Sequence, residues 1–272
     1  MKKYKLVFSD LDRTFLSRNN VPECNIEIVE KIRKKGVKFY VATGRSYDAI
    51  TYILKTLNLD NSDNEYSIIL NGSVIISNKS KNIIYFNDIN FSLSKKIFDL
   101  GKNYDIMIMF YTIDYCYCYN PLKEILKIKD IVNEKYKIIN DIEILQKEKI
   151  AKIVFSKFDK IYLEKIGIEL INKFNNEIEI SFSSEKYLEI NKKGTNKGNS
   201  VKFLSNYLNI NIEDVIAIGD NNNDLSMIEV AGLGICVANA NDDVKKKCDY
   251  ICKLTNEEGG VKEALQKFIL NE

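Results

Sequence analysis

The chain has 272 residues, of which 45% are apolar and 29% charged, with a net charge of +2 and no histidine. This length permits a sizeable core and two domains, and the near-neutral charge gives no reason to expect nucleic acid or an anionic membrane as a partner. Without histidine, serine–histidine and cysteine–histidine catalysis are excluded, so any chemistry must use carboxylates, lysine, arginine, hydroxyl groups or a metal.

The N-terminal sequence MKKYKLVFSD leads directly into a strand and lacks the long apolar stretch and cleavage site of a signal peptide. No apolar run is long enough to cross a bilayer. We therefore expect a cytoplasmic protein with no membrane partner. The six cysteines include no CxxC motif, so they do not match a zinc site, and we expect buried thiols in a reducing compartment.

Strand-like apolar runs alternate with amphipathic helical stretches along much of the chain. The strands are expected at 5–10, 38–44, 66–72, 214–220 and 234–240. The helices are expected at 25–36, 196–210 and 223–232, between several of these strands. This alternation predicts an α/β fold with a doubly wound, Rossmann-like parallel sheet that is covered on both faces.

The middle of the chain has a different pattern, with more alternating strands in neighbouring pairs. Residues 105–120 indicate a hairpin around Ile113 and Asp114, helical stretches follow at 122–135 and 159–174, and a strand follows at 177–184. We interpret this segment as an α+β cap inserted into the core. The predicted domains are 1–83 (core, first part), 84–187 (cap) and 188–272 (core, second part).

Polar residues gather after the predicted core strands, at the C-terminal ends where ligands bind in a doubly wound sheet. They are Asp10 and Asp12 after the first strand, Thr43, Gly44 and Arg45 after the second, Asn71 and Gly72 after the third, Asp220, Asn223 and Asp224 after the fourth, and Lys197 before a helix.

Each cluster alone has an ordinary structural explanation. DLDRT could be a strand and turn with aspartate as a helix cap, ATGR and NG could be turns, and GTNKG could be a loop with a solvated lysine. EF-hand calcium loops starting at Asp10 or Asp220 are excluded, because both would lack the required glycine and glutamate.

Combined, the clusters indicate phosphoryl transfer. Asp10, Asp12 and Asp220 offer the hard oxygen ligands that Mg²⁺ prefers, and the cation would offset the cost of placing carboxylates at the end of a buried strand. Thr43, the amides that follow it and the ammonium of Lys197 would supply donors to an anion.

DLDRT, ATGR, GTNKG and GDNNND, in this order, resemble the four motifs of the haloacid dehalogenase superfamily. The inserted cap, LNGS, VANAND and TNEEGGV resemble its Cof-type phosphatase branch, which carries a type-IIB cap. The resemblance covers essentially the full length. It implies a Mg²⁺-dependent phosphatase that acts on a small phosphorylated metabolite, with sugar phosphates as the leading class.

The resemblance also implies a role for each residue. Asp10 would be the nucleophile that forms an aspartyl-phosphate, and Asp12 would be the general acid and then the base. Mg²⁺ would be held by Asp10, the main-chain carbonyl of Asp12 and Asp220, with Asp224 supporting its water shell. The phosphoryl oxygens would be held by Thr43, the Gly44 amide, Lys197, Asn223 and the Leu11 amide. The remaining candidate substrate-binding residues are Arg45, Asn71 and Gly72.

Arg13 departs from the branch, which usually has glycine at this position. We expect either an ordinary negative φ or a tolerated strain there, with the side chain directed to the substrate entrance or to solvent.

Two alternatives remain open. A phosphomutase of the same fold would need basic cap groups that hold the distal phosphate. A non-catalytic phosphometabolite-binding protein could also use this fold, although a pure binder gains little from a nucleophile beside an acid. The aromatic strand pair at 111–119 packs a β-surface or lines a substrate chamber.

Overall fold

The computed structural model describes residues 4–271, so residues 1–3 and 272 of the predicted core segments lie outside the described residues. The chain forms two compact units. The first, here called the core unit, comprises 51–84 and the described parts of 1–43 and 196–272. The second, here called the inserted unit, comprises Gly44–Ile50 and Tyr85–Thr195. The sequence did not indicate that 44–50 groups with the inserted unit.

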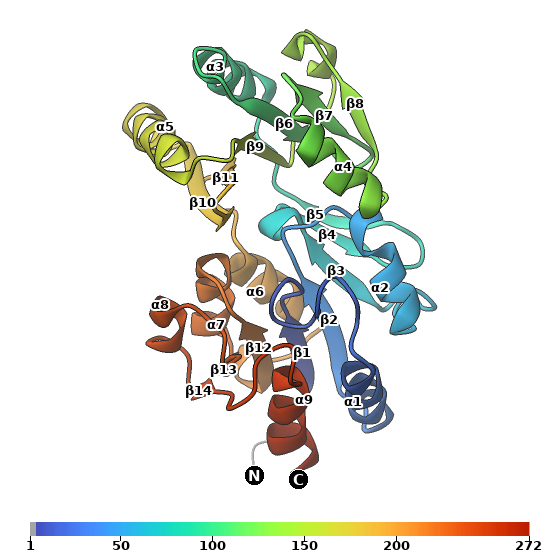
Figure 1. Ribbon diagram of the computed structural model, residues 1–272. Helices are drawn as coiled ribbons and strands as arrows, with labels where there is room; N and C mark the ends of the chain where they lie inside the picture. Colours follow the sequence, from blue (N-terminus) through green and yellow to red (C-terminus); the bar gives the residue numbers. More distant parts are fainter. Residues whose placement is uncertain (1–3, 272) are drawn as a thin grey trace. The chain divides into compact units, whose positions relative to one another are not determined.

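The core unit is built on an eight-stranded sheet in the order β14-β13-β12-β1-β2-β3-β4-β5 (Figure 1). Its strands are β1 (Leu6–Ser9), β2 (Lys38–Ala42), β3 (Tyr66–Ile69), β4 (Val74–Ser77), β5 (Ile83–Phe86), β12 (Val215–Gly219), β13 (Leu233–Cys236) and β14 (Tyr250–Ile251). Neighbouring strands from β14 to β3 are parallel, and β4 is antiparallel to β3. The predicted α/β fold is confirmed. The added edge strands β4 and β5 were not predicted.

The helices of the core unit follow the predicted strand–helix alternation. They are α1 (Glu23–Lys34), α2 (Thr51–Thr56), α6 (Lys197–Tyr207), α7 (Leu225–Val230), α8 (Asp242–Lys245) and α9 (Gly260–Leu265). In α1, Ile28, Val29 and Ile32 are buried, which is the apolar stripe of a helix that packs on one face. β1 is buried at every position, as expected of a parallel strand covered on both sides.

The inserted unit has a six-stranded sheet in the order β10-β11-β9-β6-β7-β8. Its strands are β6 (Met107–Tyr111), β7 (Cys116–Tyr119), β8 (Tyr136–Ile138), β9 (Lys152–Ser156), β10 (Ile178–Ser184) and β11 (Tyr187–Lys192), and its helices are α3 (Phe91–Gly101), α4 (Lys123–Ile131) and α5 (Lys160–Phe174). β6 and β7 form the predicted antiparallel hairpin. The unit is therefore α+β, as expected.

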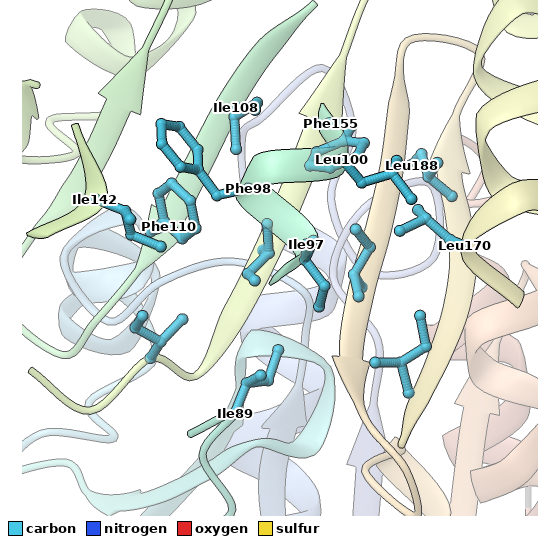
Figure 2. Close-up of a cluster of buried hydrophobic side chains, with 14 of the residues drawn as sticks. Ile89, Ile97, Phe98, Leu100, Ile108, Phe110, Ile142, Phe155, Leu170 and Leu188 are labelled. Atoms are coloured by element: carbon cyan, nitrogen blue, oxygen red, sulfur yellow. The ribbon is translucent and has the colours of Figure 1, made fainter. Parts of the chain in front are cut away.

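The main hydrophobic core of the inserted unit is formed by side chains of its sheet together with side chains of α3 and α5 (Figure 2). Phe98 of α3 and Phe110 of β6 have ring centroids 5.8 Å apart, edge to face, a favoured arrangement of aromatic rings. Gly101, the last residue of α3, packs against Phe155 of β9. A Cβ at this position would lie 2.7 Å from the Phe155 ring, so the absence of a side chain permits the close approach. On the other face, Ile125 of α4 joins a second cluster with methionine and cysteine side chains of β6 and β7.

Within residues 4–271, no helix combines the length and the apolar character that crossing a membrane requires.

Replacing Phe155 by alanine should destabilise the inserted unit by about 3–5 kcal/mol, because the ring is fully buried and its loss leaves a cavity. Urea unfolding followed by far-UV circular dichroism would measure this. Phe158→Ala is the matched control, since Phe158 is 58% exposed, and it should cost less than about 1 kcal/mol. Equal losses in the two variants would contradict the assigned core.

Candidate functional site

Two aspartates lie side by side because two neighbouring parallel strands end at the same edge of the core sheet. β1 pairs with β12 in a register that places Ser9 opposite Ile218, so Asp10 follows directly after β1 and Asp220 lies one position further along its own strand end. The Asp10 amide donates to the Ile218 carbonyl at 2.9 Å. Both side chains are buried, although residues 10 and 220 are far apart in the sequence.

Asp224 joins this pair through the turn that follows β12. Its Oδ2 accepts hydrogen bonds from the Asp220 and Asn221 amides, both at 3.0 Å. Gly219 makes this turn possible, because a Cβ there would lie 2.5 Å from the Cβ of Asp224. Oxygens of Asp10, Asp220 and Asp224 all lie within 4.8 Å of one another, so three carboxylates share one buried site.

Lys197 supplies a cation to this cluster. It is the first residue of α6, whose N-cap Asn196 accepts a hydrogen bond from the Asn199 amide. The Lys197 side chain is fully buried, and its Nζ lies 2.5 Å from Asp10 Oδ1 and 2.6 Å from Asp224 Oδ1. Burial acts to lower the pKa of Lys197, but the two carboxylates outweigh it and hold that pKa above its usual value.

One ammonium does not compensate three carboxylates. Burial and the charge of Asp224 raise the pKa of Asp10 well above its usual value, with Lys197 acting in the opposite direction. Burial and Asp224 likewise raise the pKa of Asp220 to about 7. When all three carboxylates are ionised, they therefore carry more negative charge than Lys197 neutralises.

The gathered carboxylates and one oxygen without a hydrogen bond make the cluster fit a divalent cation. Asp220 Oδ1 accepts a hydrogen bond from the Thr14 hydroxyl at 2.9 Å, whereas Asp220 Oδ2 is buried and accepts no hydrogen bond from the described residues. Carboxylate oxygens are the ligands that Mg²⁺ prefers. Asp10, Asp220 and Asp224 fit such an ion.

Leu11, Asp12 and Arg13 form the turn that leaves β1. The Leu11 carbonyl accepts from the Phe15 and Leu16 amides at 3.0 and 2.9 Å, and the Leu11 side chain is fully buried. Asp12 is exposed, and its carboxylate does not belong to the buried cluster. Arg13 has a φ of +60°. Of the two alternatives expected at this position, an ordinary negative φ or a strained backbone, the strained backbone is therefore the correct one.

The ends of β2 and β3 are joined to each other and to the turn after β12. The Thr43 amide donates to the Ile68 carbonyl at 2.9 Å, and the Thr43 carbonyl accepts from the Asn71 amide at 3.0 Å. Asn71 Oδ1 accepts from Asn223 Nδ2 at 3.4 Å. Thr43, Asn71 and Asn223 are thus brought together, although Leu70–Gly72 is also the hairpin turn between β3 and β4 that the NG signal allowed.

Gly72 lies where the β3–β4 turn meets α6. Its carbonyl accepts from the Ser200 hydroxyl at 2.7 Å. It has a φ of +93°, and a Cβ there would lie 2.4 Å from the Asn196 carbonyl oxygen. Gly72 therefore acts as a spacer that lets α6, and with it Lys197, approach the turn.

Gly44 and Arg45 belong to the inserted unit rather than to this group. Both are half-buried. The Gly44 carbonyl accepts a hydrogen bond from Lys152 Nζ of β9 at 2.9 Å. The geometry of the carboxylate cluster includes neither residue.

Sequence reasoning missed two residues that support the site. Thr14 binds Asp220, and its only signal was its place in the DLDRT motif. Ser226 accepts a hydrogen bond from the Gly198 amide at 3.0 Å, where a Cβ on Gly198 would lie 2.2 Å from the Ser226 carbonyl oxygen. Nothing in the local sequence around Ser226 indicates this contact.

Comparison with known proteins places this geometry among known folds. A sequence profile of haloacid dehalogenase-like hydrolases matches residues 7–265. A crystal structure of a haloacid dehalogenase-like hydrolase from Bacteroides thetaiotaomicron superposes with a TM-score of 0.87 at 29% identity, covering 98% of this chain and 100% of that one.

Two curated relatives differ in how much of their length the chain spans. A Buchnera aphidicola (subsp. Baizongia pistaciae) protein named "Putative phosphatase" is 31% identical over 245 residues, which is 89% of this chain and 90% of that protein. The chloroplastic endoribonuclease YBEY of Arabidopsis thaliana is 26% identical over 98% of this chain, but the chain spans only 47% of that relative's length.

Replacing Gly72 by alanine should destabilise the core unit by about 1–3 kcal/mol more than Gly36→Ala, because overpacking adds to the backbone strain. Gly36 is a matched control, since its φ is +81° and a Cβ there would meet nothing within 4 Å. Urea unfolding of the two variants would measure the difference. If both variants lost the same stability, the spacer role of Gly72 would be wrong.

Proposed function

Because the chain belongs to the haloacid dehalogenase-like hydrolase family, in its Cof-type branch, it is an enzyme of the phosphatase type, and we propose that it hydrolyses a small phosphorylated metabolite with Mg²⁺ through an aspartyl-phosphate. A sugar phosphate is the leading substrate class. The observation that carries the proposal is the buried Asp10 carboxylate, which lies at 2.5 Å from the ammonium of Lys197 inside a cluster that fits a divalent cation.

Asp10 is the nucleophile of the proposed first step. A bond forms between its carboxylate oxygen and phosphorus, and the bond between phosphorus and the leaving oxygen breaks. Mg²⁺ held by Asp10 and Asp220 would supply charge that offsets the repulsion between the carboxylates and the phosphate. Lys197 holds Asp10 Oδ1 in place and adds a second positive charge next to the phosphoryl group.

Asp12 is the proposed proton carrier. In the first step it donates a proton to the leaving alcohol, and in the second step it accepts one from the water that attacks the aspartyl-phosphate, which releases phosphate and restores Asp10. The position of Asp12 supports this role, because it is two residues from Asp10 and exposed, where it can meet substrate and water.

The remaining candidate residues are proposed to hold the phosphoryl oxygens or to shape their site. The Leu11 amide, Thr43, the Gly44 amide, Lys197 and Asn223 would donate hydrogen bonds, while Asp224 would support the metal's water shell. Arg45, Asn71 and Gly72 complete the proposed substrate site.

We also propose domain limits at 83/84 and 187/188, a cytoplasmic location, and neither nucleic acid nor a membrane as partner.

The inserted unit gives less support to a phosphomutase. A mutase needs basic groups that can hold a distal phosphate, yet the two buried lysines of this unit already have carboxylate partners. Lys129 pairs with Glu134, and Lys152 lies 3.3 Å from Glu189. Because a pure binder gains little from a nucleophile beside an acid, a non-catalytic binding protein is also less favoured.

Phosphate release from a panel of phosphorylated metabolites should require both Mg²⁺ and Asp10. Replacing Asp10 by asparagine should abolish release and the acid-stable labelling of the protein by a ³²P-substrate, because an amide is not a nucleophile of this kind. Asp214→Asn is a control with an equal charge change, since Asp214 precedes β12 and pairs with Lys5 on the surface. Full turnover by Asp10→Asn, or release in EDTA, would contradict the mechanism.

Asp12→Asn should lower kcat by about 10²–10⁴-fold on an alkyl phosphate, the usual contribution of general acid–base catalysis. Formation of the aspartyl-phosphate from an aryl phosphate such as p-nitrophenyl phosphate should fall much less, because nitrophenolate leaves without a proton. Single-turnover kinetics on both substrates would measure the two effects. Equal losses in this step would remove Asp12 from the role of leaving-group acid.

A further inference from the structure

Arg13 adopts a backbone conformation that is unfavourable for its side chain. Its φ of +60° lies in the left-handed region, which costs free energy for residues with a Cβ. Most of the other non-glycine residues with positive φ in the described chain are asparagines, which tolerate this region. A strained residue directly after the proposed general acid indicates a functional constraint.

The surrounding loop holds Arg13 through both its backbone and its side chain. Asn239 Nδ2 donates to the Arg13 carbonyl at 2.8 Å, and Arg13 Nη2 donates to the Asn239 carbonyl at 3.4 Å. Asn239 is fixed in turn by the Asn256 amide, which donates to its Oδ1 at 2.9 Å. This loop therefore selects both the strained backbone and the direction of the guanidinium.

The guanidinium points to the carboxylate oxygen that the rest of the cluster leaves without a hydrogen bond. Arg13 Nε lies 3.7 Å from Asp220 Oδ2. The Asp220 side chain is only 2% exposed, whereas that of Arg13 is 61% exposed, so the cation approaches from the solvent side. Lys197 makes its ion pairs with Asp10 and Asp224 instead. Among the described residues, Arg13 is the one cation in an ion pair with Asp220.

We propose that Arg13 is a positioning residue that shares Asp220 Oδ2 with the metal. The guanidinium approaches this oxygen from the solvent side. Asp220 Oδ2 would also be a ligand of Mg²⁺, so the positive charge of Arg13 beside it would lower the affinity of the site for Mg²⁺. The inference rests on the magnesium site of the proposed function.

The size of the effect follows from the exposure of the side chain. An exposed ion pair is worth less than about a fivefold change in an equilibrium constant. A divalent ion doubles the charge product, while solvent screens it. We therefore expect removal of the Arg13 charge to tighten Mg²⁺ binding by about fivefold.

Three substitutions separate charge from backbone strain. Arg13→Met removes the charge and retains a long side chain, Arg13→Lys retains the charge, and Arg13→Gly removes the charge and the strain together. Arg18→Met is the matched control. Arg18 also has a positive φ, of +48°, but its side chain is 86% exposed and lies beside Glu257 rather than Asp220.

Isothermal titration of the full chain with MgCl₂ alone, without substrate, measures the affinity independently of activity. Arg13→Met and Arg13→Gly should bind Mg²⁺ about fivefold more tightly than the wild type, and Arg13→Lys and Arg18→Met should bind within about twofold of it. The difference between wild type and Arg13→Met should shrink when the salt concentration rises from about 0.02 M to about 0.5 M KCl, because it is electrostatic.

The inference fails if Arg13→Met binds Mg²⁺ with wild-type or weaker affinity, or if its advantage is unchanged at high salt. It also fails if Arg13→Lys binds as tightly as Arg13→Met, because strain or side-chain shape would then be the cause. A wild-type chain that binds no Mg²⁺ at all would overturn the proposed function and this inference together, so the two failures are distinguishable.

Discussion

The arrangement of residues at the ends of the core strands depends on the ion pairs that the Lys197 ammonium makes. The ammonium lies between Asp10 and Asp224 at hydrogen-bond distance and is fully buried, so it offsets part of the carboxylate charge where water does not reach. A buried ion pair is tolerated only when its geometry and its further hydrogen bonds are good. The N-cap of α6, the register between β1 and β12 and the turn after β12 together provide that geometry.

Close approach of backbones is the second requirement of this site, and glycine meets it at three points. Gly72 lies against the start of α6, Gly198 lies against α7, and Gly219 lies against the side chain of Asp224. In each case a Cβ would come closer than 3 Å to a neighbouring atom. The site is thus compact because at these three positions the absence of a Cβ lets a neighbouring backbone or side chain approach closely.

Patterns within a short stretch of sequence predicted most of the fold. Buried strands such as β1 and β12 are continuous apolar runs, and α1 shows helical spacing, so local periodicity was enough to predict them. The convergence of Asp10 and Asp220 also followed, because parallel strands end at one edge. Contacts set by tertiary register were not predictable, including the Thr14–Asp220 hydrogen bond across 206 positions, the positive φ of Arg13 and the grouping of 44–50 with the inserted unit. The chemical role of each site residue stays a prediction.

The pairing of β1 with β12 has a consequence for the chain as it leaves the ribosome. β1 is synthesised before β12, its neighbour on one side, which begins only at Val215, after the whole inserted unit. Until then, one edge of an apolar strand lacks its partner, and Asp10 lacks both Lys197 and Asp224. An unpaired strand edge is a template for aggregation, and contacts between distant segments form slowly. The core sheet therefore cannot be completed until β12 has been synthesised. The inserted unit, in contrast, is a nearly continuous stretch of chain that is complete before β12 exists.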